Sequence, residues 1–551
     1  MCSAYPFNLG SYQRSTSTTS IEAEAWFNRG LLWSYAFNHE EAIRCFERAI
    51  SADGRFGLAH WGLAYAAGPN YNKPWDAFDD ADLRESLGRA YGAAQRAAAL
   101  ADGAPAVERD LIGALAARYP HREPADDLSR WTAAYADAMR EVRAAHPDDL
   151  DVAALSADAL MNVTAWSLWD LRSGGPAEGA HTPEARQVLE SALAQTGGMT
   201  HPGLLHFYIH LMEMSPTPEA ALEAAGALRG LAPDAGHLIH MPTHIDVLLG
   251  DYGRVIDENE RAIAADERHA AHVGRVNFYA LYRSHDHHFR IYGAMFAGRR
   301  ATALAAADAL AASLPEDLLR VDIPPMADWL ESFVPMRLHV LVRFGMWQEI
   351  IDEPLPADPE LYSVTTALTH YAKGVAFAAL AQIPEAERER ERFAAAVTRV
   401  PDTRYLFNNT ARDILAIASA MLDGEIAYRN GDHESAWLHL LRAIELDDTL
   451  PYDEPWGWMQ PTRHAYGALL LEQGEIERAL DAYAADLGLD QTLPRACQHP
   501  NNVWSLHGYH ECLTRLGRVE EARSIESRVA RGLAAADIEI RSSCFCRLGR
   551  P

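Results

Sequence analysis

Apolar and small residues recur every three or four positions along most of the chain. The alanine-rich stretches LRESLGRAYGAAQRAAALA (83–101) and ATALAAADALAASL (301–314) show this pattern clearly. Such a period places the apolar residues on one face of an α-helix. Runs of Val, Ile and Thr, which are typical of strands, are nearly absent. The pattern therefore predicts an all-α fold.

The helical pattern recurs as pairs of helices. In AEAWFNRGLLWSYAFNHEEAIRCFERAISADG (23–54), the small and aromatic residues take positions 4, 8, 20, 24 and 27, namely Trp26, Gly30, Ala42, Phe46 and Ala49. Small residues at these positions let two helices touch, and the aromatic residues fill the gap between them. DGEIAYRNGDHESAWLHLLRAIELDD (423–448) and HAYGALLLEQGEIERALDAYAADL (464–487) keep this spacing. The register resembles that of tetratricopeptide repeats.

This resemblance implies a right-handed superhelical array of helical hairpins that encloses a concave cavity. Breaks rich in Pro, Gly or polar residues fall at 173–183, 352–360 and 492–502, and they are loops within one superhelix or boundaries between domains. We expect amino-terminal hairpins over 23–175, central hairpins over 184–350 and carboxy-terminal repeats over 361–533. The ends, 1–22 and 534–551, are expected to be weakly ordered tails.

Histidines concentrate in the central hairpins, since residues 201–288 contain 11 of the 24 in the chain. In tetratricopeptide proteins, positions 2, 5, 9 and 12 of the first helix share one face, which is turned toward the bound partner. In three successive hairpins these positions hold His206, His210 and Glu213, then His237, His240 and His244, then His285 and His288. We expect these side chains to line one groove.

Pro242 weakens this alignment. Proline is unfavourable inside a helix and favourable in its first turn. A helix that begins near Met241 would leave His237 and His240 in the preceding turn. Further along, where the register is weaker, the same positions hold His339, His464, His507 and Glu511.

The histidine spacing predicts a transition-metal site. Neutral imidazole is a common metal ligand, and two histidines four residues apart can bind one ion from one helix face. His206/His210 and His240/His244 are such pairs. With His285 and His288 they predict one or two ions of Cu, Fe or Zn. We expect Glu213 and His237 to be catalytic, with Glu213 acting as a ligand, as a group that orients a ligand, or in proton transfer. The alternative is a metal-free polar groove whose histidines form hydrogen bonds or contact a peptide.

Two further stretches are candidates for the wall of a substrate pocket. GPNYN (68–72) supplies Asn70 and Asn72, and PYDEPWGWMQPTRH (451–464) supplies Trp456, Trp458, Arg463 and His464. The alternatives are helix capping by the asparagines and aromatic packing between hairpins. CFC (544–546) has the composition of a soft-metal site, although two cysteines alone are a weak signal.

Several strings resemble a more specific group. HPGLLHFYIHLME, AGHLIHMPTHI and HDHHF are similar to the strings HPGxxHxYIHxxE, AGHLxHMPxHI and HNxHF of a group of large bacterial and fungal tetratricopeptide-like proteins. The match includes His201 and the eight groove residues named above. It departs at Asp286, Asp246 and Val247, and His287 is left out of the site. The resemblance supports the site but implies no particular reaction.

The composition of the chain indicates which classes of partner and which cellular compartment to expect. A formal net charge of −28 repels phosphate backbones, so we expect no nucleic-acid partner. Six cysteines predict no disulfide framework, and neither a signal peptide nor a membrane span is expected. These features favour a cytoplasmic protein.

Together, these patterns predict a metal-dependent enzyme, most simply an oxidoreductase or oxygenase that acts on a small organic molecule with bound Cu or Fe. A Zn-dependent hydrolase or lyase is the nearest alternative, because the ligands do not fix the reaction. A second alternative function is a metal carrier without turnover. A third is a non-catalytic scaffold that binds a peptide or protein partner in its groove.

Overall fold

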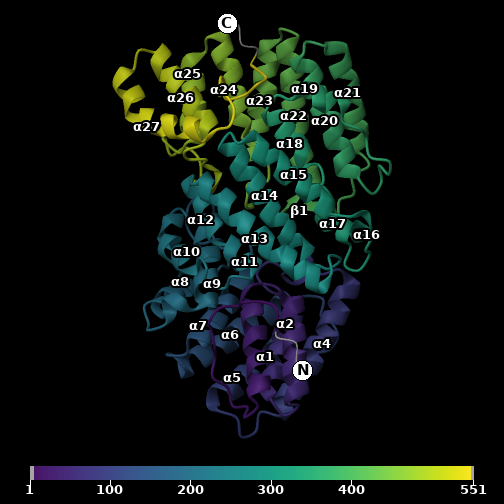
Figure 1. Cartoon of the computed structure of the whole chain (residues 1–551), viewed down its shortest axis with the longest axis vertical. Helices are drawn as coiled ribbons and strands as arrows, with labels where there is room; N and C mark the ends of the chain where they lie inside the picture. Colours follow the sequence, from purple (N-terminus) through teal and green to yellow (C-terminus); the bar gives the residue numbers. More distant parts are fainter. Residues whose placement is uncertain (1–4, 548–551) are drawn as a thin grey trace. The chain divides into compact units, whose positions relative to one another are not determined.

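The computed structural model describes residues 5–547, so predictions for residues 1–4 and 548–551 lie outside the described part. The chain divides into two compact units: unit 1 comprises residues 1–245 and 261–279, and unit 2 comprises 246–260 and 280–551. Helices dominate each unit (Figure 1), which confirms the predicted all-α fold. Among the described residues the strands are β1 (Tyr405–Leu406) and β2 (Asn409–Thr410), a short antiparallel pair.

Unit 1 is built from helices joined by short loops. They are α1 (Ile21–Tyr35), α2 (His39–Ala52), α3 (Gly57–Ala67), α4 (Asp80–Ala99), α5 (Ala106–Arg118), α6 (Ser129–Ala145), α7 (Leu150–Met161), α8 (Thr182–Leu193), α9 (Pro202–Glu213), α10 (Leu222–Leu228), α11 (Gly236–His240), and parts of α12 (Pro242–Leu249) and α13 (Tyr252–Val273). Short 3-10 turns lie at Trp75–Ala77, Asn162–Thr164, Gly198–Thr200 and Pro218–Ala221.

Unit 2 contains the other parts of α12 and α13 and all the remaining helices. They are α14 (Ala280–Phe296), α15 (Arg300–Ser313), α16 (Glu316–Leu319), α17 (Met326–Leu330), α18 (Met336–Arg343), α19 (Trp347–Asp352), α20 (Ser363–Ala379), α21 (Ile383–Val397), α22 (Ala411–Arg429), α23 (His433–Asp448), α24 (Thr462–Gln473), α25 (Ile476–Asp486), α26 (Val503–Arg515) and α27 (Val519–Ala535). Its 3-10 turns are Glu331–Phe333 and Arg495–Cys497.

Helical hairpins are the building block of both units. Successive helices such as α1 and α2, α22 and α23, or α24 and α25 pack against each other. Glycine makes this contact possible: a Cβ atom at Gly30 would lie 2.7 Å from the Phe46 ring, and one at Gly467 would lie 2.5 Å from the Tyr483 ring. These are the small and aromatic positions that the repeat register predicted. The hairpins at Gly30 and Gly467 therefore pack as the repeat register predicted.

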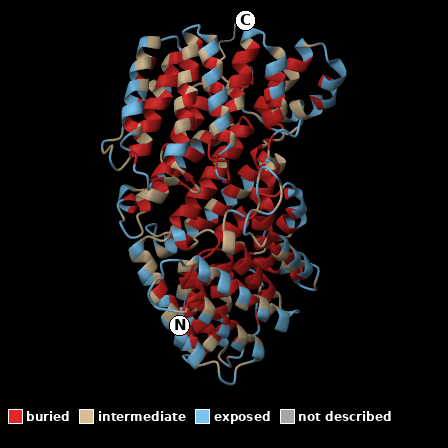
Figure 2. Cartoon of the chain, turned by 180° about the vertical axis from the view of Figure 1, so that it is seen from behind, coloured by how far each residue is buried: buried red, intermediate tan, exposed pale blue. Residues whose placement is uncertain are grey.

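Short polar side chains fix where several helices begin. Ser20, Asn38 and Asp432 precede α1, α2 and α23, and each accepts a hydrogen bond from a backbone N–H of the first turn. This bond pairs an N–H that has no partner within the helix. In Figure 2 the buried residues lie on the helix faces turned toward neighbouring helices.

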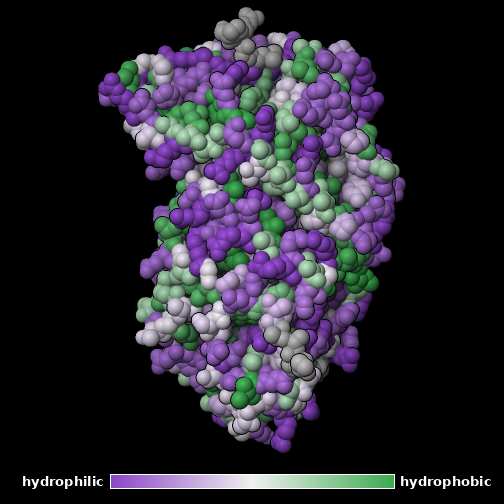
Figure 3. Space-filling model, viewed as in Figure 1, coloured by the Kyte–Doolittle hydropathy of each residue, from purple (hydrophilic) through white to green (hydrophobic). Residues whose placement is uncertain are grey.

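The face of the molecule drawn in Figure 3 is mostly polar, with apolar residues scattered over it. In the described part of the chain, no helix has both the length and the apolar character needed to cross a bilayer.

The described parts of both ends, which the sequence predicts to be tails, contact distant parts of the chain. At the start, Arg14 forms ion pairs with Asp149 and Asp151 at 2.8 and 2.7 Å. Near the other end, Asp537 accepts hydrogen bonds from the backbone N–H groups of residues 300 and 301 at the start of α15. These partners lie more than a hundred residues away along the chain, so local sequence gave no sign of them.

Candidate metal centre

α9 carries three predicted site residues on a fully buried helix. Pro202 starts it, where a missing N–H costs nothing, and the His201 ring accepts a hydrogen bond from a backbone N–H of the first turn at 3.2 Å. Every residue of α9 is buried. His206, His210 and Glu213 therefore project from a helix that neighbouring elements hold in place.

His206, His210 and His237 come together in unit 1. One ring nitrogen of each residue lies within 4.8 Å of those of the other two, and all three residues are buried. The ring centroids of His206 and His210 are 4.7 Å apart, and that of His237 is 4.9 Å from His206. Two nitrogens on one Zn²⁺ ion lie at most about 4.2 Å apart, because each Zn–N bond is about 2.1 Å long. Modest ring rotation would therefore let all three contact one ion.

Hydrogen bonds set the tautomers of two of these rings. The Nδ1–H of His206 donates to the carbonyl oxygen of Tyr35 at 2.6 Å, and the Nδ1–H of His210 donates to Oε1 of Glu213 at 3.0 Å. Both acceptors are oxygens without a proton, so Nδ1 is the donor and Nε2 keeps its lone pair. Within residues 5–547, neither Nε2 atom has a hydrogen-bond partner, although both are buried. Each ring therefore presents a metal-binding lone pair.

Glu213 joins a second pair of histidines to the first. Its Oε2 accepts a hydrogen bond from Nδ1 of His244 at 2.8 Å, while Oε1 holds His210. The Nε2 atoms of His240 and His244 are 2.7 Å apart. A carboxylate that accepts from Nδ1 of a ligating histidine is a common arrangement around metal ions, because it fixes the ring and raises its basicity. This geometry favours the orienting role for Glu213 over direct ligation.

Burial keeps the α9 imidazoles neutral. It lowers the pKa of His206 well below the usual value, and the neighbouring His210 lowers it further. Burial likewise lowers the pKa of His210, and His244 adds to the shift. Both rings therefore lack the extra proton at neutral pH, which is the form that binds a metal.

Pro242 acts as the sequence suggested it would. α12 begins at Pro242, and the preceding residues form a separate short helix, α11, rather than a turn. His237 and His240 lie on α11, and His244 lies on α12. The break divides the three histidines between two sets, because His237 joins the α9 pair while His240 contacts His244.

Aromatic rings enclose the unit 1 histidines, and sequence reasoning missed them. Phe37 lies 4.6, 5.6 and 5.5 Å from the rings of His206, His210 and His237. It follows α1 with a left-handed φ of 53°, a conformation that a bulky residue rarely adopts. Trp166 lies 6.0 Å from His210. Only the three-dimensional arrangement shows these contacts.

His285 and His288 belong to unit 2, so their membership in the same site as the unit 1 histidines stays a prediction. His285 packs 4.9 Å from Phe289 and 4.6 Å from Phe407. His288 lies on the same helix, α14, and is fully buried.

The side chain of Asn70 holds the GPNYN loop. Oδ1 of Asn70 accepts hydrogen bonds from the backbone N–H groups of Asn72 and Lys73 at 2.9 and 3.0 Å. This bonding holds a turn and does not cap a helix, and contact of Asn70 or Asn72 with a substrate stays a prediction. The neighbouring Tyr71 contacts the site directly, since its ring lies 4.9 Å from that of His210.

The predicted pocket residues of unit 2 divide into two kinds. Trp458 and His464 line a cavity of about 30 Å³, which is about the size of one water molecule. Trp456 donates to the carboxylate of Asp447 at 3.0 Å, and Arg463 forms an ion pair with Asp448 at 2.5 Å. The latter two thus anchor the loop, and contact of any of the four with a substrate stays a prediction.

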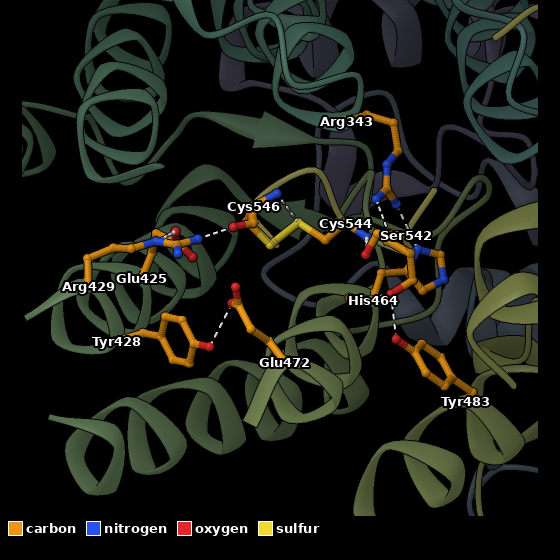
Figure 4. The surroundings of a disulfide bond; sticks show 11 residues. Arg343, Glu425, Tyr428, Arg429, His464, Glu472, Tyr483, Ser542, Cys544 and Cys546 are labelled. Atoms are coloured by element: carbon orange, nitrogen blue, oxygen red, sulfur yellow. Dashed lines mark hydrogen bonds and ion pairs between the residues drawn. A yellow bond between two sulfur atoms is a disulfide. The ribbon is translucent and has the colours of Figure 1, made fainter. Parts of the chain in front are cut away.

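The end of the described chain packs around the same cavity (Figure 4). His464 accepts a hydrogen bond from Arg343 at Nδ1 and donates from Nε2 to Asp486, at 2.7 and 3.0 Å. The hydroxyl of Ser543 donates to the carbonyl oxygen of His464 at 2.8 Å. His464 is thus held by its surroundings on both sides of its ring.

Cys544 and Cys546 form a disulfide, as Figure 4 shows. Their sulfurs are bonded to each other, so in this structure they present no free thiolate to a soft metal. Cys45, Cys497 and Cys512 are free. One local bridge is not a disulfide framework, so the described cysteines agree with that expectation.

Comparison with known proteins supports the repeat. Residues 23–56 match the family model described as tetratricopeptide repeat. This segment is a tetratricopeptide repeat. It contains α1 and α2, whose contact at Gly30 and Phe46 is described above. No curated protein sequence matches the chain.

Solved structures show only distant similarity. The crystal structure of the APC/C hetero-tetramer Cut9–Hcn1 matches with 13% identity and a TM-score of 0.30, covering 95% of this chain and 88% of that one. The crystal structure of Ypp1 matches with 9% identity and a TM-score of 0.29, covering 96% and 89%. Scores this low support no argument about function.

Proposed function

We propose that this protein is a metal-dependent enzyme whose unit 1 binds a transition-metal ion through His206, His210 and His237. The observation that carries the proposal is the pair of buried Nε2 lone pairs on α9, which have no partner in the described part of the chain, with a ring nitrogen of His237 within reach. Leaving such buried acceptors unpaired costs about 1–3 kcal/mol each. A bound ion would remove that cost and explain the arrangement.

The donor set favours Zn, Cu or Fe over Mg or Ca, because imidazole nitrogen suits these borderline ions. Three protein ligands also favour catalysis, since structural zinc sites usually close the fourth position with protein and catalytic sites leave it open. His237, predicted as a catalytic residue, serves as a ligand in this proposal. The His240/His244 pair offers ligands for a second ion.

Oxidation of a small organic molecule by bound Cu or Fe is the reaction class we propose. A bound metal ion would activate dioxygen or water at its open position. Glu213 holds the Nδ1–H groups of His210 and His244 and thereby directs both Nε2 atoms. The aromatic rings around the site exclude water. A Zn-dependent hydrolase or lyase uses the same residues in the same roles.

An interaction scaffold is the second candidate. The tetratricopeptide repeat at residues 23–56 favours it, because such repeats commonly present a groove to a peptide or helix. In that case a protein partner, rather than a small molecule, would be the ligand. The histidines would then only hold the core together.

Elemental analysis of untagged protein separates these functions. We expect about one or two equivalents of Cu, Fe or Zn per chain, and the loss of one in a His206→Ala/His210→Ala variant with unchanged helical circular dichroism. The matched control is His439→Ala, a partly exposed histidine of unit 2. Dioxygen uptake across a substrate screen then separates an oxidase from a hydrolase. A folded protein that takes up none of the three metals overturns the enzyme proposal in favour of the scaffold.

A further inference from the structure

His288 is a fully buried imidazole whose ring has no hydrogen bond to any described residue. Its exposed fraction is 0%, and within residues 5–547 neither Nδ1 nor Nε2 has a hydrogen-bond partner. A neutral imidazole always carries one N–H donor and one lone pair. Burying both without partners is unfavourable, because each atom loses its hydrogen bond to water. Native proteins rarely leave such a pair of atoms unused.

His339, on the neighbouring helix, is also a buried histidine with an unpaired ring nitrogen among the described residues. α14 carries His288, α18 carries His339, and these helices pack against each other. His339 is also buried, and its Nδ1 has no hydrogen-bond partner in the described part of the chain. Its ring lies 5.1 Å from that of Trp458, edge to face.

The helices that carry the two rings pack against each other, and burial keeps both rings neutral. Burial lowers the pKa of His288 to about 3, and the charge of protonated His339 adds to that shift. Burial alone lowers the pKa of His339 to about 4. Both rings therefore keep a lone pair at neutral pH, as metal ligands must.

Apolar rings surround this histidine pair. Phe333 lies 5.4 Å from His288, and Phe407 lies 6.3 Å from it in a stacked orientation. Phe407 is held in the β1–β2 turn with a left-handed φ of 49°, while Asn408 next to it donates to the carbonyl oxygen of Tyr452 at 3.0 Å. An apolar shell excludes water and strengthens the bond between a metal and its ligands.

We propose that His288 and His339 form a second transition-metal site, contained within unit 2. Two neutral imidazoles suit Zn, Cu, Fe or Ni, and the remaining coordination positions are open to water or a small ligand. All the residues that carry this proposal lie in unit 2. It is therefore independent of the proposed function of unit 1, and either site can exist without the other.

Zinc loading tests this site separately from the first. Protein stripped with a chelator is reloaded with Zn²⁺, desalted and measured by elemental analysis. We expect His288→Asn/His339→Asn to bind one equivalent less than wild type, while His206→Ala/His210→Ala loses a different equivalent and the combined variant loses both. His433→Asn/His439→Asn, two partly exposed histidines of the same unit, is the matched control. Unchanged zinc content in folded His288→Asn/His339→Asn overturns the proposal, whatever the unit 1 variant shows.

Anomalous diffraction from zinc-loaded wild-type crystals keeps the proposal testable if that variant does not fold. A peak above the zinc absorption edge, within bonding distance of a ring nitrogen of both His288 and His339, supports the site. A peak at the unit 1 histidines together with ordinary water density at His288 and His339 refutes it. That second result would leave the unit 1 proposal intact.

Discussion

Replacing Glu213 with glutamine should weaken metal binding in unit 1 without removing a proposed ligand. The two carboxylate oxygens accept hydrogen bonds from Nδ1 of His210 and of His244, at 3.0 and 2.8 Å. A glutamine amide has one oxygen and one NH₂ group, so it can accept from only one of these rings. The other ring must turn or shift its proton to Nε2, and it then loses the lone pair that faces the metal.

The expected decrease in metal affinity follows from the loss of this orienting hydrogen bond. Removing a group that orients a metal ligand typically weakens metal affinity 10- to 100-fold, which is about 1.4–2.8 kcal/mol at 25 °C. Competition with a chromogenic zinc chelator, read as the dissociation constant of the tighter site, measures it. Helix content by circular dichroism should stay unchanged, because the substitution keeps the size of the side chain.

Glu425→Gln is the matched control for losing a buried carboxylate. Glu425 is buried in unit 2 and forms an ion pair with Arg429 at 2.8 Å. We expect its variant to bind zinc as wild type does. If folded Glu213→Gln binds zinc with wild-type affinity, the reasoning about proton positions is wrong, and Glu213 has another role.

Three further predictions concern stability. Gly30→Ala should destabilise the fold by about 1–3 kcal/mol in urea unfolding, because its Cβ would meet a ring of α2 at 2.7 Å. Gly92→Ala, with nothing within 4 Å, should stabilise it by up to about 1 kcal/mol, and equal effects would contradict the packing argument. Burial lowers the pKa of His464 to about 4, so the unfolded chain takes up a proton first as the pH falls. Stability should therefore decrease from about pH 6.5 toward pH 4, by about 3 kcal/mol in total, and His464→Asn should show a flatter pH profile. Deleting every residue after Ala535 should cost at least about 2 kcal/mol, because buried Arg343 loses its carbonyl acceptor at Ser543; an unchanged melting temperature would show that this contact is unimportant.

Local spacing was enough to predict the hairpins. Gly30 and Gly467 fall at the same position of their repeats, and each meets an aromatic ring of the following helix. Such contacts join residues less than twenty positions apart, so the sequence displays both partners together. The α9 pair is equally local, because residues four apart share a helix face.

Contacts between residues far apart in the sequence could not be predicted from local spacing. Phe37 and Trp166 reach the α9 histidines from distant segments and from backbone conformations that their residue types rarely adopt. Arg14 forms ion pairs with Asp149 and Asp151. The sequence predicts only a tail around residue 14, because these partners lie more than a hundred residues away. No period or motif marks these pairs, because the fold alone brings them together.

Pro242 explains why the unit 1 histidines form two sets rather than one row. In a continuous helix, residues 237, 240 and 244 would share a face. Proline cannot donate the N–H that would continue the helix, so α11 ends at His240 and α12 starts anew. His237 then joins the α9 pair, while the Nε2 atom of His240 contacts that of His244. Glu213 hydrogen-bonds to one member of each set, so a proton or ion at one set changes the ring that Glu213 holds in the other. Binding at the two sets should therefore be coupled through this carboxylate, and substitution of Glu213 should remove the coupling as well as weaken the first site.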